Sequence, residues 1–179
     1  TGKFAFENNA KERLTGLPGA PAGQIQQIQE FSSGGLAGVW APQNTREAIW
    51  DAMQRKETFG TSGPMMKVRF FGGFDYAVDD VNKADFVKRA YAKGVPMGGD
   101  LKAAPAGKAP TFLIAAMKDV QGANLDRYQI VKGWMDKDGK LHEKVYDVAW
   151  SAGRSPDPKT GKVPAVGNTV NVADASYTN

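Results

Sequence analysis

The sequence contains no cysteine and one histidine, His142, among its 179 residues. Without cysteine the chain forms no disulfide, supplies no thiolate nucleophile and offers no cysteine-based zinc site. A single histidine also excludes a histidine-rich zinc site, because such a site needs three or more protein ligands. These absences leave little visible catalytic equipment in the chain.

The sequence also lacks a long apolar run and a strong excess of one charge. Runs such as Thr111–Met117 are far shorter than the roughly 20 apolar residues that a membrane-spanning helix needs. The net charge is only +4, and lysine and arginine are spread along the chain, which does not favour a nucleic-acid binder. Hydrophobic residues make up 41% and charged residues 23%, which is typical of a folded globular chain.

The best-specified segment runs from Asn44 to Gly73 and begins as a helix. Asn44 is a strong N-cap, and Glu47 three residues later completes a capping box. Arg55 and Lys56 would occupy the last turn, where cations suit the helix dipole. The apolar positions share one face: Ala48, Ile49, Ala52 and Met53.

A turn and a strand follow this helix. We expect the turn at Thr58–Gly63, because Gly63 and Pro64 favour a change of direction. Apolar and charged residues then alternate as in a half-buried strand: Met66, Val68 and Phe70 against Lys67 and Arg69. Gly72 and Gly73 would end that strand, and Leu36–Ala41 before the helix is a second short strand.

The remaining segments change from helical to strand-like. A helix is expected over Lys83–Lys93, with Asn82 or Asp80 as its cap and Gly94 as its left-handed C-terminal residue. Asp138-Gly139 predicts a tight hairpin turn, so Tyr128–Met135 and Leu141–Trp150 should pair in antiparallel fashion. Three further elements are predicted from weaker patterns: a strand over Thr111–Asp119, a short strand near Thr169–Val172, and a helix carrying Ile25, Ile28 and Phe31.

These elements predict an α+β fold. An N-terminal helix–turn–strand piece, residues 1–75, would form an α/β part. Residues 76–179, with one helix near 83–93, would form a mostly antiparallel sheet or sandwich-like part.

Few side chains suggest chemistry. His142 follows the hairpin turn among charged neighbours, so we interpret it as a solvated strand residue; acid–base work would need a partner that the spacing does not reveal. The acidic groups in residues 75–80 and 135–139 lack the spacing of a calcium loop, and a helix cap and a hairpin turn explain them. The four tryptophans are interpreted as core or sheet packing: Trp40, Trp50, Trp134 and Trp150.

The candidate substrate-lining residues lie in or beside the segment Asn44–Gly73. The hydroxyls of the turn could face an anion or a metal-bound substrate, or could simply belong to a tight turn. The two arginines could bind a carboxylate or phosphate in bidentate fashion, or form structural ion pairs. The candidates are Arg46, Thr58, Thr61, Ser62 and Arg69.

The run from Gly34 to Tyr76 resembles a large bacterial family of unknown function, related to the carbaryl-hydrolase-type metallohydrolases and more distantly to the polymerase and histidinol phosphatase superfamily. The matching motifs are Gly34–Leu36, Val39–Ala41, Asn44–Ile49, Arg55–Thr58, Thr61–Pro64 and Val68–Gly73. Arg127–Trp134 and Glu143–Ser151 resemble the family's downstream hairpin, so the similarity covers most of residues 1–151. Met65 stands where the family usually has an arginine.

The resemblance implies a metal-dependent hydrolase that acts on an ester-like or phosphoester-like bond of a small molecule. Its ligands for zinc or manganese, including His-x-Asp and Asp-x-His elements, would lie upstream. The chain is then expected to be a C-terminal portion that is inactive alone, with residues 1–75 as the C-terminal remnant of an α/β metallohydrolase-like domain. The chain itself is expected to contain no catalytic residue, no metal ligand and no cofactor. The resemblance also suggests export or a periplasmic location. The alternative is a non-catalytic, β-rich binding or interaction module. Apolar surface on Ile49, Met53 or Leu36–Trp40 would favour a homodimer.

Overall fold

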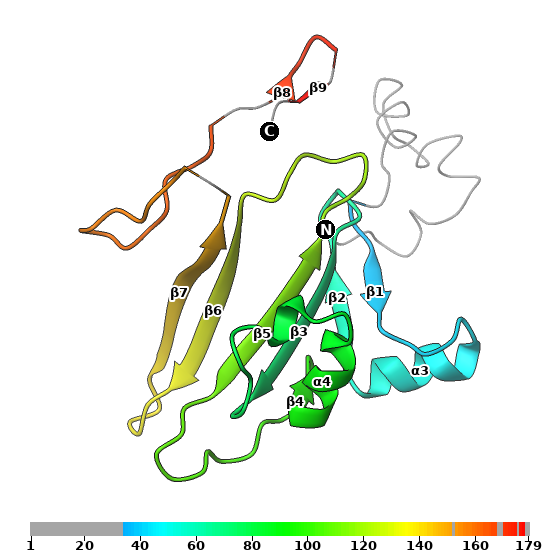
Figure 1. The fold of residues 1–179 in the computed structure, drawn as a ribbon, viewed down its shortest axis with the longest axis vertical. Coiled ribbons are helices and arrows are strands. Elements are labelled where there is room, and N and C mark those ends of the chain that lie inside the picture. Colours follow the sequence, from blue (N-terminus) through cyan, green and yellow to red (C-terminus); the bar gives the residue numbers. More distant parts are fainter. Residues whose placement is uncertain (1–33, 152, 168–169, 175, 178–179) are drawn as a thin grey trace, which may run out of the picture. The chain divides into compact units, whose positions relative to one another are not determined.

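The structure, a computed structural model, describes residues 34–151, 153–167, 170–174 and 176–177 (Figure 1). The chain divides into two compact units, Thr1–Met117 and Lys118–Asn179. Both contain antiparallel strands, and the first also contains helices, so the fold class is α+β and mostly antiparallel, as predicted. The proposed origin of residues 1–75 in a larger α/β domain stays a prediction.

The described part of the first unit begins with two short strands that flank a helix. Strand β1 (Ala37–Val39) pairs in antiparallel fashion with β2 (Thr58–Gly60), and helix α3 (Arg46–Gln54) connects them. The strand predicted over Leu36–Ala41 is therefore confirmed. The predicted turn at Thr58–Gly63 is partly wrong, because its first three residues form β2. A turn could not satisfy their backbone groups as the ladder to β1 does.

Helix α3 is capped one residue later than predicted. Thr45 has extended dihedral angles, and its hydroxyl oxygen accepts a hydrogen bond from the Ala48 backbone N–H at 3.3 Å. With Thr45 as the cap, Glu47 occupies the second helical position, so the predicted capping box does not form. Glu47 still places a negative charge in the first turn, where it suits the helix dipole.

The C-terminal end of α3 is closed by a Schellman motif. The Lys56 N–H donates to the Met53 carbonyl at 2.9 Å, and the Glu57 N–H donates to the Ala52 carbonyl at 3.0 Å. Lys56 has φ 58°, a left-handed conformation that glycine usually provides. Arg55 and Lys56 thus lie just beyond the helix rather than in its last turn, which contains no basic residue.

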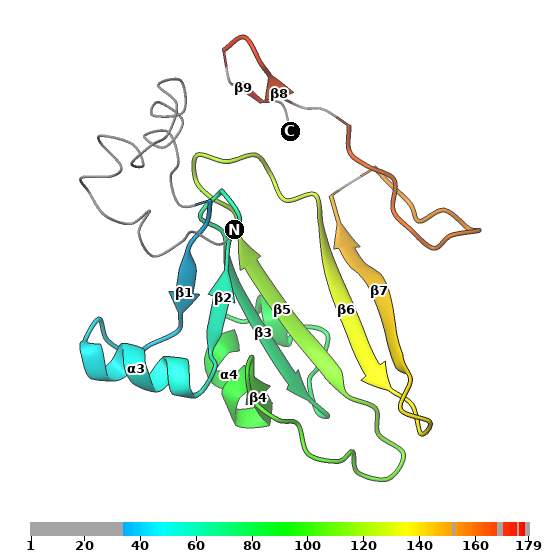
Figure 2. The same ribbon diagram turned by 180° about the vertical axis from the view of Figure 1, so that it is seen from behind.

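A three-stranded sheet with the order β4–β3–β5 forms the centre of this unit. Strand β3 (Lys67–Gly73) pairs in antiparallel fashion with β4 (Gly94–Pro96) on one side and β5 (Thr111–Met117) on the other. The strand predicted over Thr111–Asp119 is confirmed within two residues. The strand predicted over Met66–Phe70 is also present, but Gly72 and Gly73, which were predicted to end it, are part of it and pair with β4 and β5. Seen from behind, β3 and β5 lie in front of helix α4 (Phe86–Lys93) (Figure 2).

The core lies between this sheet and α4. Its buried members are Phe71, Tyr76, Ala90 and Leu113, with Val81, Phe86 and Val87 packed against them. Phe71 is only 2% exposed and shares its strand face with Lys67 and Arg69, so the predicted burial of the Val68 and Phe70 face alone is wrong. On the opposite face of β3, the Phe70 ring stacks on the Phe112 ring at 5.2 Å. Apolar residues therefore contact both faces of β3 at this point.

Helix α4 begins three residues later than predicted and ends at Lys93, as predicted. A 3-10 turn, η3 (Asp80–Asn82), precedes it, and its N-cap is Asp85, which makes no capping side-chain hydrogen bond. Buried Asp80 instead accepts from the Ala77 N–H at 2.8 Å and pairs with Lys93 Nζ at 2.6 Å. Lys93, followed by the Ala77 N–H, lowers the pKa of the Asp80 carboxyl.

Gly94 does not adopt the predicted left-handed conformation. Its φ is −168°, and it begins strand β4. A Cβ at this position would lie 2.2 Å from the Gly72 carbonyl oxygen and 2.3 Å from the Tyr76 hydroxyl. Close approach between strands therefore explains the glycine here, rather than the dihedral angle of a helix cap.

The second unit contains a long hairpin. Strand β6 (Arg127–Met135) pairs with β7 (Leu141–Trp150), with an irregularity between Tyr128 and Gln129, which confirms the predicted pairing. The Asp136 N–H donates to the Lys140 carbonyl at 3.0 Å, which leaves a three-residue connection. Gly139 takes φ 79°, the left-handed position that such hairpins require.

The segment after β7 is tied to the base of the hairpin by arginine side chains. Arg127 donates to the Val163 and Pro164 carbonyls at 2.5 and 3.0 Å, and Arg154 also donates to Pro164 at 2.8 Å. Two short strands, β8 (Val170–Asn171) and β9 (Ser176–Tyr177), pair further on. The strand predicted near residues 169–172 is thus confirmed at 170–171, whereas the helix predicted from Ile25, Ile28 and Phe31 lies outside the described residues.

Candidate functional site

The threonines and the serine proposed as substrate-lining residues belong to the β1–β2 pair and the turn after it. Thr58 pairs with Val39 and is exposed. The Thr61 hydroxyl oxygen accepts from the Leu36 N–H at 3.0 Å, and the Thr61 N–H donates to the Leu36 carbonyl at 2.8 Å. Thr61 therefore extends the ladder between the two segments, while Ser62 is exposed beside it.

The two predicted arginines lie in different surroundings. Arg46 is exposed in the first turn of α3. Arg69, in β3, stacks its guanidinium carbon 3.7 Å from the centroid of the Trp40 ring. Its Nη1 atom also donates to the Tyr91 hydroxyl at 3.5 Å, so contacts from two other segments fix the guanidinium.

Arg69 lines a pocket of about 230 Å³ beside the sheet. Seven further residues from four segments line the same pocket: Trp40, Lys67, Phe86, Val87, Ala115, Ala116 and Met117. Lys67 and Arg69 are two residues apart in β3, and they face the same side as Phe71, where α4 packs. The pocket thus combines mostly apolar walls with two cationic side chains.

A buried carboxylate, that of Glu57, helps to fix the residues that contact Arg69. Glu57 is 2% exposed, accepts a hydrogen bond from the Tyr91 hydroxyl, and pairs with Arg55 Nη2 at 3.2 Å. Its backbone carbonyl accepts from the Trp40 N–H at 3.0 Å. Glu57 therefore holds both Tyr91 and the backbone of Trp40. Tyr91 and Trp40 are the two residues that contact the Arg69 guanidinium.

The indole of Trp40 is fixed by further contacts. Its Nε1 donates to the Val68 carbonyl at 2.9 Å, and its ring lies 5.7 Å from that of Phe59. Burial, followed by the hydrogen bond to Glu57, raises the pKa of the Tyr91 hydroxyl above its ordinary value of 10.0. Tyr91 is therefore a neutral hydrogen-bond donor throughout the physiological pH range.

Only Arg69 among the predicted candidates lines the pocket. The others, Arg46, Thr58, Thr61 and Ser62, are not among its lining residues. Sequence reasoning missed Lys67 and Trp40 as site residues, although the strand alternation placed Lys67 on the same face as Arg69. Nothing in the sequence indicated that Trp40 would meet that face, because the contact depends on tertiary packing.

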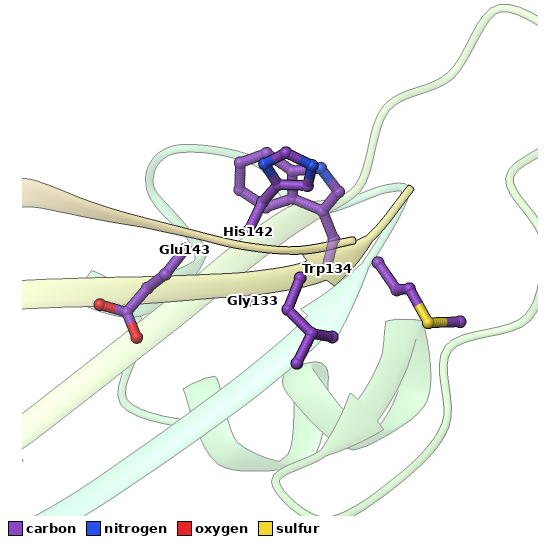
Figure 3. A pocket seen from close by; sticks show the side chains of 6 residues that line it. Gly133, Trp134, His142 and Glu143 are labelled. Carbon is purple, nitrogen blue, oxygen red and sulfur yellow. The ribbon is translucent and has the colours of Figure 1, made fainter. Parts of the chain in front are cut away.

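A second concavity, of about 500 Å³, lies at the tip of the hairpin (Figure 3). The Trp134 and His142 rings stack at 5.2 Å on one side of the ribbon, and Glu143 projects from the other. The lining residues are Gly133, Trp134, Met135, Leu141, His142 and Glu143, so no hydroxyl, thiol or amine nucleophile lines it.

His142 has the partner that the sequence did not reveal. Its Nε2 lies 2.6 Å from Asp136 Oδ2, and the ring is about one-third exposed. The hydrogen bond to His142, followed by the backbone N–H groups of Lys140 and Asp138, lowers the pKa of the Asp136 carboxyl. The hairpin register could have indicated this pair, because Asp136 and His142 lie diagonally across the turn.

The tryptophans are less buried than predicted. Trp50 is 63% exposed on α3, so its assignment to the core is wrong for this chain. Trp134 and Trp150 remain partly exposed on the hairpin, and Trp40 is half-buried. A two-stranded ribbon cannot bury a large side chain from both faces, which explains the two hairpin cases.

The described residues do not fit the metal that the family resemblance implies. No group of three or more histidine, aspartate or glutamate side chains lies close enough together in the described part of the chain to hold a metal ion. Its one histidine is bound to a single carboxylate. Within the same residues, no helix is both long enough and apolar enough to cross a bilayer.

The fold and the pocket define a mostly antiparallel α+β protein with an apolar, cation-bearing pocket. The chain belongs to the family described as protein of unknown function, DUF3604, whose sequence model matches residues 1–179. Searches of the curated proteins and of the solved structures found no match.

Proposed function

We propose that this chain is the scaffold and cleft-lining part of a metal-dependent hydrolase that acts on a small molecule. The pocket around Arg69 is the single observation that carries the proposal, because it is apolar, built from several segments and lined by two cationic side chains, of which Arg69 is held in place by Trp40. The resemblance of the Asn44–Gly73 segment to carbaryl-hydrolase-type metallohydrolases supports it.

The chain's role in this proposal is to bind and orient. Arg69 is held by Trp40 and Tyr91, so little side-chain freedom is lost when a ligand binds it. A zinc or manganese ion would be held by residues of other segments of a longer protein. We assign no reaction step to that ion and no catalytic residue to this chain.

The test uses a longer protein that contains this chain together with upstream His-x-Asp and Asp-x-His elements. We expect zinc- or manganese-dependent hydrolysis of phenyl acetate or phenyl phosphate, and a raised KM in the Arg69→Gln variant. Arg46→Gln is the matched control, because Arg46 is exposed and outside the pocket. Unchanged kinetics in Arg69→Gln would refute the cleft-lining role, and absence of metal-dependent turnover would refute the hydrolase.

The alternative, a non-catalytic binding or interaction module, rests on the hairpin. One face of the ribbon carries exposed apolar side chains: Val131, Met135, Leu141 and Val145. A two-stranded ribbon is marginally stable in water by itself, so a partner that covers this face would stabilise it. Replacing Leu141 with lysine would abolish partner binding under this alternative and leave hydrolysis unchanged under the leading proposal.

A further inference from the structure

We propose that the pocket around Arg69 binds an organic anion with a compact apolar body, such as an aromatic carboxylate or an aryl phosphate. The inference deepens the proposed function by naming the substrate class, and rests on that function only in treating the pocket as part of a cleft. Binding of such an anion needs neither a metal nor turnover, so it can be measured on this chain directly.

The geometry of Arg69 leaves donors available for an anion. A guanidinium stacks through its flat face, while its five N–H groups radiate within its plane. The flat face of the Arg69 guanidinium stacks on the Trp40 ring at 3.7 Å, and its Nη1 atom donates to the Tyr91 hydroxyl at 3.5 Å. Stacking therefore fixes the plane without consuming the edge that binds a carboxylate or phosphate in bidentate fashion.

The charge balance of the pocket also favours an anion. Lys67 and Arg69 both line it, and no carboxylate is among its lining residues. Glu57, the acid that accepts a hydrogen bond from Tyr91, also pairs with Arg55. None of the ion pairs among the described residues joins Lys67 or Arg69 to an aspartate or glutamate. Two neighbouring cations thus share one concavity with no internal counter-charge.

The apolar walls and the volume of the pocket indicate the chemistry and the size of the uncharged part of the ligand. Phe86, Val87, Ala115 and Met117 supply carbon surface from α4 and β5. The volume of about 230 Å³ lies below the range of about 300–1,000 Å³ that is usual for drug-sized ligands. A single ring or a short branched chain suits this space, whereas a nucleotide or an oligosaccharide is too large for it.

Isothermal titration calorimetry on the 179-residue chain tests the proposal with four small probes. Benzoate and phenyl phosphate carry both a ring and an anionic group. Benzyl alcohol keeps the ring without the charge, and acetate keeps the charge without the ring. We expect both aromatic anions to bind about tenfold or more tightly than benzyl alcohol or acetate, because only they use the cations and the apolar walls together.

Variants assign the binding to the pocket. Arg69→Gln is expected to reduce benzoate affinity to about that of benzyl alcohol, and Lys67→Gln to reduce it by a smaller factor. Lys102→Gln is the matched control, because Lys102 is an exposed lysine of the same unit outside the pocket. Near-ultraviolet circular dichroism checks folding; if Arg69→Gln does not fold, Lys67→Gln and the comparison of probes on the unmodified chain decide.

Three results would overturn the proposal: equal affinity for benzoate and benzyl alcohol, unchanged benzoate affinity in folded Arg69→Gln, or no heat of binding with benzoate up to about 10 mM. Its failure is distinguishable from failure of the hydrolase. Anion binding without hydrolysis by the longer protein removes only the proposed reaction. Hydrolysis without preference for aromatic anions removes only this ligand class.

Discussion

The hydroxyl of Tyr91, on α4, donates a hydrogen bond to the carboxylate of Glu57, which follows α3 and is buried. This bond joins the segment between α3 and β2 to helix α4, and Tyr91 in turn accepts a hydrogen bond from Arg69. Glu57 has Arg55 as its other side-chain partner, so its oxygens are paired although water cannot reach them. The pocket therefore depends on a buried polar network as well as on the apolar core.

Replacing Tyr91 with phenylalanine tests that network. The change keeps the ring packed on Phe71, at 5.1 Å, and leaves a Glu57 oxygen without its donor. We expect a loss of about 1–3 kcal/mol in the free energy of unfolding, measured by urea denaturation. Ser62→Ala, which removes an exposed hydroxyl, should change it by less than about 0.5 kcal/mol. Equal stability of Tyr91→Phe and the unmodified chain would refute the role of this bond.

The same bond gives a pH dependence at alkaline pH. Because the folded-state pKa of Tyr91 lies above the ordinary value of 10.0, its contribution to stability is complete below pH 10. That contribution is lost as pH rises through the folded-state pKa. Ultraviolet titration should therefore give the same tyrosinate signal near pH 10 for the folded unmodified chain and for folded Tyr91→Phe. After unfolding, the unmodified chain should show one more tyrosine that titrates near pH 10 than Tyr91→Phe. A tyrosinate signal from Tyr91 below pH 10 in the folded chain would contradict the assignment.

Lys56 offers a stabilising substitution. It adopts φ 58° at the Schellman position that closes α3, where a side chain costs energy that glycine avoids. Lys56→Gly should raise the free energy of unfolding by about 0.5–1 kcal/mol, measured by thermal and urea denaturation. Lys102→Gly, an exposed lysine without positive φ, should be neutral or slightly destabilising. Destabilisation by Lys56→Gly would mean that the lysine side chain makes a contact that outweighs the strain.

The local elements were predictable because their signals lie within a few residues. The hairpin followed from Asp138-Gly139, and Gly139 takes the left-handed conformation that this turn demands. Helix α3 was predictable from its apolar face. Its N-cap was not, because Asn44 and Thr45 are both good capping residues; Asn44 was predicted and Thr45 is the cap. The prediction for Gly94 was wrong because glycine is favoured both by a left-handed helix cap and by close approach of two strands, and the sequence does not distinguish the two.

The pocket was only partly predictable because it is made by packing. Arg69 was recognised from its residue type and its position in a strand. Its neighbours Trp40 and Phe86 lie far away in the sequence, and no periodicity relates them to Arg69. The hydroxyls of Thr61 and Ser62 were attractive as chemistry, yet Thr61 extends the ladder to Leu36. Backbone pairing and aromatic stacking therefore decided which candidate faces the pocket.

The hairpin tip should respond to acid through Asp136. Its carboxyl pKa lies below the ordinary value of 3.8, chiefly because of the hydrogen bond to His142. The contribution of this group is thus present above pH 3.8 and is lost as pH falls through the folded-state pKa. We expect the amide resonances of Asp138 and Lys140, whose N–H groups donate to the Asp136 carboxylate, to shift with a midpoint below pH 3.8, as followed by nuclear magnetic resonance.

Two variants separate this effect from general acid unfolding. Asp136→Asn should abolish the amide transition, while Asp138→Asn should leave it in place, because the Asp136 carboxylate accepts the N–H groups of residues 138 and 140. A transition that persists in Asp136→Asn would assign it to another group. A midpoint above pH 3.8 would contradict the stabilisation of the ionised carboxylate.

We also propose that apolar surface beside α3 supports self-association. Leu36, Trp50 and Met53 are each more than half exposed, whereas Ile49 on the same helix is half-buried. Analytical ultracentrifugation should detect a concentration-dependent dimer that Trp50→Glu weakens, because burying an unpaired charge in an apolar interface is costly. Val78→Glu, at another highly exposed apolar residue, is the control. A strict monomer at high concentration would count against a dimer.

The most direct measurement concerns the division of labour between this chain and the metal centre. The purified 179-residue chain is dialysed against zinc or manganese, its bound metal is measured by mass spectrometry, and hydrolysis of phenyl acetate and phenyl phosphate is followed. If the chain supplies scaffold and cleft lining only, it holds no stoichiometric metal and shows no metal-dependent turnover. Stoichiometric metal with turnover by this chain alone would contradict that account.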